Sequence, residues 1–121
     1  MAKIKRLLKS FVYAFRGLFK TMSEEQNLQI QFLAGLTVVV LGWCLEIKAW
    51  EWCVLLLVIF IVILMEMMNS AVERIVDILK PRLDNYVKEI KDIMAASVML
   101  ASLVAVIIGL IIFLPYFFKL S

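Results

Sequence analysis

Three apolar stretches, each long enough to cross a lipid bilayer, limit most strongly how this chain of 121 residues can fold. We place them at residues 28–47, 51–72 and 93–113, with Pro115 ending the third. A membrane-spanning helix needs about 20 mainly apolar residues. Backbone polar groups inside a bilayer must also be paired within the segment, which favours helices. The sequence therefore predicts an all-α membrane protein, in which the second helix continues to about residue 79.

The composition supports this class and argues against others. Hydrophobic residues make up 64% of the chain and the mean hydropathy is +0.99, whereas soluble domains contain about 45–50% apolar residues. We expect a single domain over residues 1–121, too small to enclose a deep site without other chains. Histidine is absent, which excludes His-based catalysis and His-ligated metals. Nucleic-acid binding is not expected, because there is no soluble basic domain.

The N-terminal segment, residues 3–23, has the pattern of an amphipathic helix. A helix with one apolar and one cationic face is typical of a segment that lies in the membrane surface. The apolar face holds Ile4, Leu7, Leu8, Phe11, Phe15, Leu18, Phe19 and Met22, and the basic face holds Lys3, Lys5, Arg6, Lys9, Arg16 and Lys20.

The remaining basic residues predict the orientation in the membrane. Those of the second connection are Arg74, Lys80, Arg82, Lys88 and Lys91, whereas the opposite side carries only Lys48 and Lys119. Because cytoplasmic segments carry the excess of Lys and Arg, we expect a cytoplasmic N-terminus and an external C-terminus. The expected location is the inner membrane of a bacterial cell.

A stripe of polar residues follows the end of the second apolar stretch. At about 100° per helical residue, and taking Glu66 as zero, Asn69 lies near 300°, Ser70 near 40°, Glu73 near 340° and Asp77 near 20°. Ionisable groups inside a membrane segment are costly, and they usually face a partner, an ion pathway or a watery cavity. The stripe is therefore a candidate functional site.

Charged residues of the other two spans fall at the same predicted depth. Glu25 precedes the first span, and Lys91 and Asp92 begin the third. Glu66 and Glu73 are flanked by apolar residues, which favours a functional role for both. The charged residues expected to be solvated by lipid headgroups are Glu24, Glu51, Asp84, Lys88 and Glu89.

These residue types suit phosphoryl transfer, where catalysis rests mainly on positioning and charge stabilisation. Mg²⁺ is usually held by one or two carboxylates together with substrate phosphates, and Glu25 with Glu73 fits that pattern. Glu66 lies deeper, where a lipid hydroxyl can reach it and a carboxylate can act as general base. Lys91 can hold phosphate oxygens. The glycines form neither a P-loop nor a glycine-rich kinase loop, so these residues alone leave the substrate open.

Two motifs resemble the signature of the small prokaryotic diacylglycerol kinase family. Residues 66–77 read EMMNSAVERIVD and residues 91–96 read KDIMAA. The family pattern is E-x-x-N-[ST]-A-[IV]-E-x-x-x-D followed by K-D-x-[AG]-[AS]-A, and this chain departs from it at Met94, in the [AG] position. The resemblance implies a homotrimer of three-span chains, with active sites between subunits that transfer the γ-phosphate of ATP to a membrane lipid alcohol.

The resemblance also implies roles for individual residues. Glu66 would be the general base that removes the lipid hydroxyl proton, and Glu25 and Glu73 would hold Mg²⁺. The residues implied in ATP binding are Arg6, Tyr13, Glu25, Glu73, Lys91 and Asp92. Asn69 and Asp77 would support the site.

The choice of lipid separates two branches of the family, one acting on diacylglycerol and the other on undecaprenol. Residues 109–115 and 24–27 look more like the undecaprenol branch, which is therefore favoured. A non-catalytic oligomer with a cation pathway lined by Glu66 and Glu73 is the alternative outside the enzymes, since acidic rings select cations. It would not require Lys91 and Asp92 at the same depth.

Overall fold

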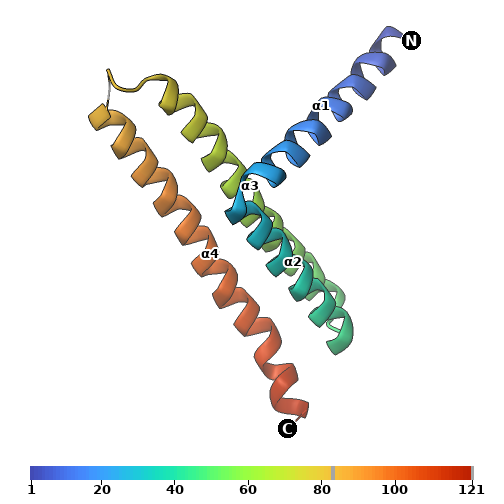
Figure 1. Cartoon of the computed structure of the whole chain (residues 1–121). Coiled ribbons are helices and arrows are strands. Elements are labelled where there is room, and N and C mark those ends of the chain that lie inside the picture. The colour runs from blue at the N-terminus through green and yellow to red at the C-terminus, as the bar shows by residue number, and fades with distance from the viewer. Residues whose placement is uncertain (83, 121) are drawn as a thin grey trace.

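The computed structural model describes residues 1–82 and 84–120 and is built from helices (Figure 1). The helices are α1 (Ala2–Glu24), α2 (Gln26–Leu45), α3 (Ala49–Ile78) and α4 (Asp84–Leu120). Three of them, α2, α3 and α4, are long and apolar enough to cross a membrane. The predicted all-α class with three such helices is confirmed.

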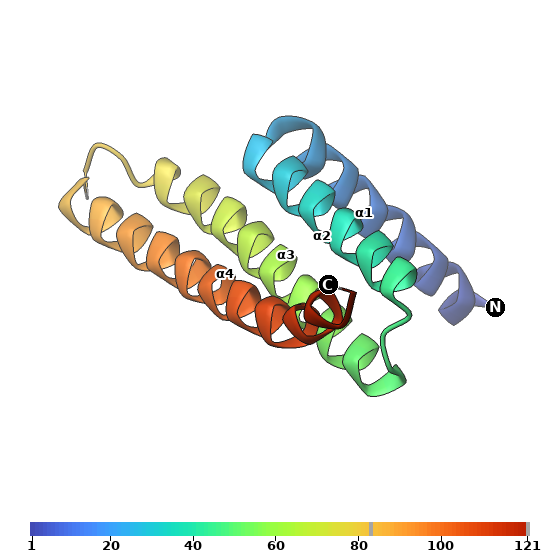
Figure 2. The ribbon, with the colours of Figure 1, turned by 90° about the horizontal axis from the view of Figure 1, so that it is seen from below.

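The three long helices lie side by side, with α3 between α2 and α4 (Figure 2). The α3–α4 interface is the most extensive, followed by that between α2 and α3. Helix α1 projects away from these three as a separate arm (Figure 1), and none of its residues is buried. The site residues on α1 are therefore remote from those on α3 within one chain.

The fourth helix is longer than the predicted third span. It begins at Asp84 and continues through Pro115 to Leu120, so the prediction that it ends at Pro115 is wrong. Proline removes one backbone donor and crowds the preceding turn, but neighbouring groups in membrane proteins often compensate for a proline within a helix. Here the next residue, Tyr116, donates a hydrogen bond from its hydroxyl to Glu51 of α3.

Glu51 is a structural residue at the start of α3. It is only 6% exposed, and its Oε1 accepts a hydrogen bond from the backbone N–H of Lys48 at 2.9 Å. This contact caps one of the unpaired amides at the helix N-terminus. The expectation that Glu51 is solvated by headgroups is therefore wrong. A buried apolar cluster lies at the same end of the molecule and comprises Ile47, Leu55, Ile112 and Phe113.

Helices α2 and α3 approach closely at a glycine. A Cβ atom built on Gly35 would lie 2.9 Å from Cγ2 of Ile59, too near for an undisturbed contact. A Cβ atom built on Gly109 of α4 would meet nothing within 4 Å. The glycine at position 35 is therefore required by the α2–α3 packing, and the one at position 109 is not.

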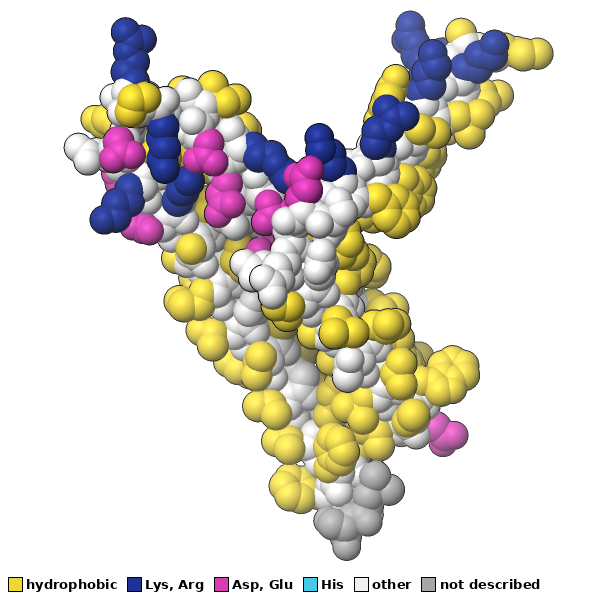
Figure 3. Space-filling model, in the orientation of Figure 1, with side chains coloured by type: hydrophobic (Ala, Val, Ile, Leu, Met, Phe, Trp, Pro, Cys, Tyr) yellow, Lys and Arg dark blue, Asp and Glu magenta, His cyan; other side chains and the backbone are white. Residues whose placement is uncertain are grey.

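Charged side chains gather at one end of the molecule, where α1 meets α2 and where α3 connects to α4 (Figure 3). Below this end the visible surface is mainly hydrophobic. The polar stripe of α3 lies at the boundary between the two regions, because α3 runs from the apolar end toward the charged one.

Candidate active site

Glu66 is a buried carboxylate on α3. It is 4% exposed, and Ser70, about one turn further along the helix, is 2% exposed. Val62, about one turn before it, is buried as well. This face of α3 is therefore covered by the neighbouring helices, and Glu66 marks the place where it changes from apolar to polar.

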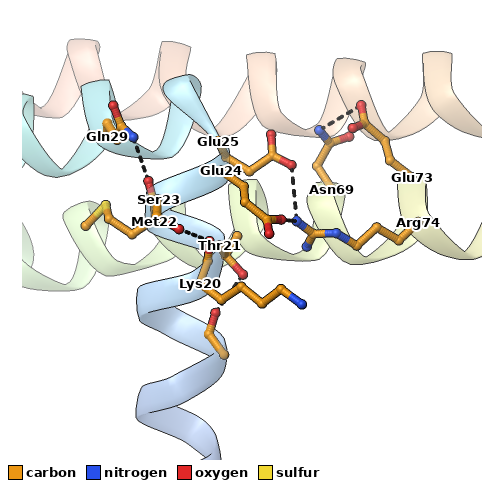
Figure 4. A network of polar contacts seen from close by, with 11 residues as sticks. Lys20, Thr21, Met22, Ser23, Glu24, Glu25, Gln29, Asn69, Glu73 and Arg74 are labelled. Atoms are coloured by element: carbon orange, nitrogen blue, oxygen red, sulfur yellow. Dashed lines mark hydrogen bonds and ion pairs between the residues drawn. The ribbon is translucent and has the colours of Figure 1, made fainter.

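Two further carboxylates face Glu66. The charges of Glu25, between α1 and α2, and Glu73, further along α3, both act on Glu66, and the side chain of Asn27 is its hydrogen-bonding neighbour. The amide Nδ2 of Asn69 donates to Oε1 of Glu73 at 3.5 Å (Figure 4). Glu25 and Glu73 thus lie near enough to Glu66 for their charges to act on it, and the amides of Asn27 and Asn69 neighbour Glu66 and Glu73 respectively.

An arginine from α3 reaches the connection between α1 and α2 (Figure 4). Nη2 of Arg74 lies 2.7 Å from Oε2 of Glu24 and 3.6 Å from Oε1 of Glu25. Glu25 has an extended backbone, with φ −109° and ψ 109°, and separates the two helices. The acidic connection therefore lies against the polar edge of α3.

Helix α4 contributes a lysine to the same region. Nζ of Lys91 lies 2.8 Å from Oδ1 of Asp77 on α3, and the charge of Glu73 also acts on this lysine. Lys91 thus extends the group of charged residues across the α3–α4 interface, and Asp77 holds it there.

Three predicted nucleotide-binding residues lie outside this group in a single chain. Asp92 is exposed and borders a separate shallow hollow of about 400 Å³ on α4. Arg6 and Tyr13 are exposed on α1, which projects away from the other helices (Figure 1). The Tyr13 ring lies beneath the guanidinium of Arg16, whose Cζ is 5.5 Å from the ring centre.

An apolar groove of about 420 Å³ runs between α2, α3 and α4. Val62 of α3 lines it, and Glu66 follows about one helical turn further along the same face. The lining is apolar apart from the side chains of Gln31 and Ser102. The groove therefore leads from the middle of the apolar region toward the carboxylates.

Comparison with known proteins identifies the family of this chain. The family model described as prokaryotic diacylglycerol kinase matches residues 12–113. The chain belongs to this family. It is therefore a lipid kinase, which confirms the prediction made from the two motifs.

Relatives of the kinase carry two different names. An undecaprenol kinase from Bacillus subtilis (strain 168) is 34% identical over 113 residues, covering 93% of this chain and 92% of the relative. A diacylglycerol kinase from Synechocystis sp. is 33% identical over 110 residues, covering 90% of this chain and 63% of the relative. The diacylglycerol kinase of Escherichia coli (strain K12) is 29% identical over 112 residues, covering 93% and 92%.

A metal ion arriving with a nucleotide would find two carboxylates near Glu66 in this kinase, those of Glu25 and Glu73. In residues 1–82 and 84–120, no three His, Cys, Asp or Glu side chains are grouped so as to hold a metal ion by themselves. Glu25 and Glu73 both act on Glu66 from nearby. One or two carboxylates are what Mg²⁺ usually takes from a protein, with phosphates and water completing its shell.

Three polar residues near Glu25, Glu66 and Glu73 are not among the predicted site residues of the kinase. In the sequence, Arg74 contributes to the orientation signal, Glu24 is expected to be solvated, and Asn27 has no predicted role. Arg74 lies at about 80° from Glu66 around the helix, at the edge of the stripe. The helical repeat predicts this position of Arg74 from the sequence. It does not predict that Arg74 pairs with Glu24, because that contact depends on where the α1–α2 connection docks.

Proposed function

We propose that this kinase transfers the γ-phosphoryl group of ATP to the hydroxyl of a membrane lipid alcohol at the cytoplasmic face. One observation carries the proposal: a buried carboxylate, Glu66, sits beside Glu25 and Glu73 and about one turn beyond an apolar groove. A lipid chain in the apolar region and a polyphosphate at the charged end would meet there.

Glu66 acts as the general base in this proposal. It accepts the hydroxyl proton while the lipid oxygen bonds to the γ-phosphorus and the bond to the β–γ bridging oxygen breaks. ADP leaves, and Glu66 then releases its proton to water. The position of Glu66, about one turn beyond Val62 of the apolar groove, supports this role, because a base must come within hydrogen-bonding reach of the proton it removes.

Glu25 and Glu73 hold Mg²⁺ with the nucleotide. When bound, Mg²⁺ neutralises charge on the phosphates. Asn69 orients Glu73 through the hydrogen bond between their side chains. Lys91, held by Asp77, supplies a positive charge to phosphate oxygens. The residues proposed to contact the nucleotide from elsewhere are Arg6, Tyr13 and Asp92.

The proposed assembly is a homotrimer with active sites between subunits. Arg6 and Tyr13 belong to α1, which projects away from the other helices (Figure 1), so we propose that they reach the site of a neighbouring subunit. Helix α1 would lie in the interface of the inner membrane, with the N-terminus cytoplasmic and the C-terminus outside. The gathering of charge at one end of the molecule supports this orientation (Figure 3).

Undecaprenol is the favoured lipid because residues 24–27 and 109–115 resemble the undecaprenol branch. Diacylglycerol is the alternative, since relatives with similar identity carry each name. The test offers each lipid separately to the purified protein in mixed micelles with Mg²⁺ and γ-labelled ATP. We expect label to enter undecaprenol faster than diacylglycerol. Faster labelling of diacylglycerol would reverse the choice, and labelling of neither would contradict the proposed activity.

A further inference from the structure

We infer that Arg74 is a positioning residue that holds the α1–α2 connection against α3 and so keeps Glu25 beside Glu66 and Glu73. The signature motif leaves position 74 open, so the family pattern does not require this arginine. The inference rests on the proposed function in one respect, the binding of a divalent metal–nucleotide complex by Glu25.

Arg74 joins α3 to both sides of a helix break. Glu24 is the last residue of α1, and Glu25 is the extended residue before α2. The same guanidinium nitrogen lies 2.7 Å from Glu24 and 3.6 Å from Glu25. Arg74 therefore contacts both sides of the break from α3 (Figure 4).

The connection has other anchors besides Arg74, since Asn27 is a hydrogen-bonding neighbour of Glu66 and Leu28, in the first turn of α2, is fully buried. Helix α1 buries no residue, and the Nε2 of Gln29 donates to the carbonyl of Met22 at 2.7 Å, which braces the connection within itself. Among the residues the structure describes, the ion pairs between this connection and α3 are those of Arg74. Arg74 is thus well placed to control where Glu25 lies.

The two glutamates share the arginine unequally. The contact with Glu24 is a charge-assisted hydrogen bond by its length, whereas 3.6 Å to Glu25 is too long for one. Glu25 therefore keeps its oxygens available for a cation. Glu24 also helps to position Glu25, because its closer contact holds the guanidinium of Arg74 away from the Glu25 carboxylate.

The contribution of this contact to overall stability should be small. The side chains of Arg74 and Glu24 are 48% and 47% exposed, and exposed ion pairs stabilise proteins little. We expect the melting temperature of Arg74→Gln to stay within about 2 °C of that of the wild type. The substitution should instead weaken the binding of the metal–nucleotide complex, because a small displacement of the Glu25 carboxylate is expected to lower the affinity strongly.

The test measures binding of Mn²⁺–ATP to the full-length protein by electron paramagnetic resonance, with Mn²⁺ replacing Mg²⁺ as a visible ion. Arg74→Gln should raise the Kd about tenfold, and Arg74→Lys should restore most of the affinity because the charge is kept. Glu24→Gln should also raise the Kd, about threefold, because the freed arginine then pairs with Glu25. The double variant should bind no worse than Arg74→Gln, since both changes act through one contact.

Arg82→Gln is the matched control, because it removes the same charge from the connection between α3 and α4. Hydrogen exchange of residues 21–29 gives a second readout, and it should become faster in Arg74→Gln but not in the control. An Mn²⁺–ATP affinity within twofold of the wild type in Arg74→Gln, with unchanged exchange, would overturn the inference. A wild type that binds Mn²⁺–ATP but labels no lipid would contradict the proposed function and leave the positioning role standing.

Discussion

At the scale of single residues, the site is a group of like charges that needs cations. The charges of Glu25 and Glu73 act on Glu66 near the boundary of the apolar region. Arg74 of α3 and Lys91 of α4 lie in the same region, and their positive charges offset part of the negative charge. A divalent ion that arrives with phosphates would compensate the remainder, which explains why such an unfavourable grouping is tolerated.

Glu73→Gln tests the metal-binding part of this account. Losing one carboxylate should raise the Mg²⁺ concentration needed for half-maximal activity by about tenfold or more, because the amide is a much weaker ligand. Turnover at saturating Mg²⁺ should fall less. The measurement is the Mg²⁺ dependence of lipid phosphorylation at fixed ATP, with Glu89→Gln, an exposed carboxylate on α4, as control. An unaltered Mg²⁺ dependence in Glu73→Gln would remove this residue from the metal site.

The polar stripe on α3 was predictable, whereas its partners from other helices were less so. The angular positions of Glu66, Glu73 and Asp77 follow from the helical repeat alone. The contact of Arg74 with Glu24 depends on how the α1–α2 connection docks on α3, which helical periodicity does not specify. The family resemblance implied the role of Glu25, and the structure adds that Arg74 lies next to it.

At the scale of helices, the lengths of the apolar stretches predicted the elements but not their ends. Helix α4 continues through Pro115, and the hydrogen bond from the Tyr116 hydroxyl to the buried Glu51 joins its last turns to α3. The sequence pattern at Pro115 favours a helix end, and it contains no sign of this contact between residues distant in the chain. The same contact explains the burial of Glu51, which composition alone placed among solvated charges.

A pair of glycine substitutions tests the packing of these helices. Gly35→Ala should destabilise the protein by about 1–3 kcal/mol, since the new methyl group meets Ile59. Gly109→Ala should be neutral or stabilise by up to about 1 kcal/mol, because it faces open space and alanine favours helix. Thermal unfolding in detergent measures both. Equal stability of the two variants would contradict the close approach of α2 to α3.

At the scale of the whole molecule, an isolated chain leaves its proposed site incomplete. Helix α1 carries Arg6 and Tyr13 away from Glu66 (Figure 1). Large apolar side chains are exposed along α2, α3 and α4, where lipid or neighbouring subunits would cover them. A trimer with shared sites accounts for both features.

Mixed assemblies of two inactive variants test shared sites directly. If α1 of one subunit serves Glu66 of another, co-assembly of Arg6→Gln with Glu66→Gln leaves some sites with both residues intact. Random mixing in equal amounts should restore about a quarter of wild-type activity, since each of the two contributions is intact half the time. Activity no higher than that of the separate variants would place each site within one chain.

The central claim is that Glu66 removes the proton from the lipid hydroxyl, and the most direct test is single-turnover transfer of label from ATP to lipid by Glu66→Gln. The account predicts a rate at least about 100-fold lower, with Mn²⁺–ATP binding within a few-fold of the wild type and Glu89→Gln at the wild-type rate. Transfer by Glu66→Gln at a rate close to that of the wild type would contradict the claim.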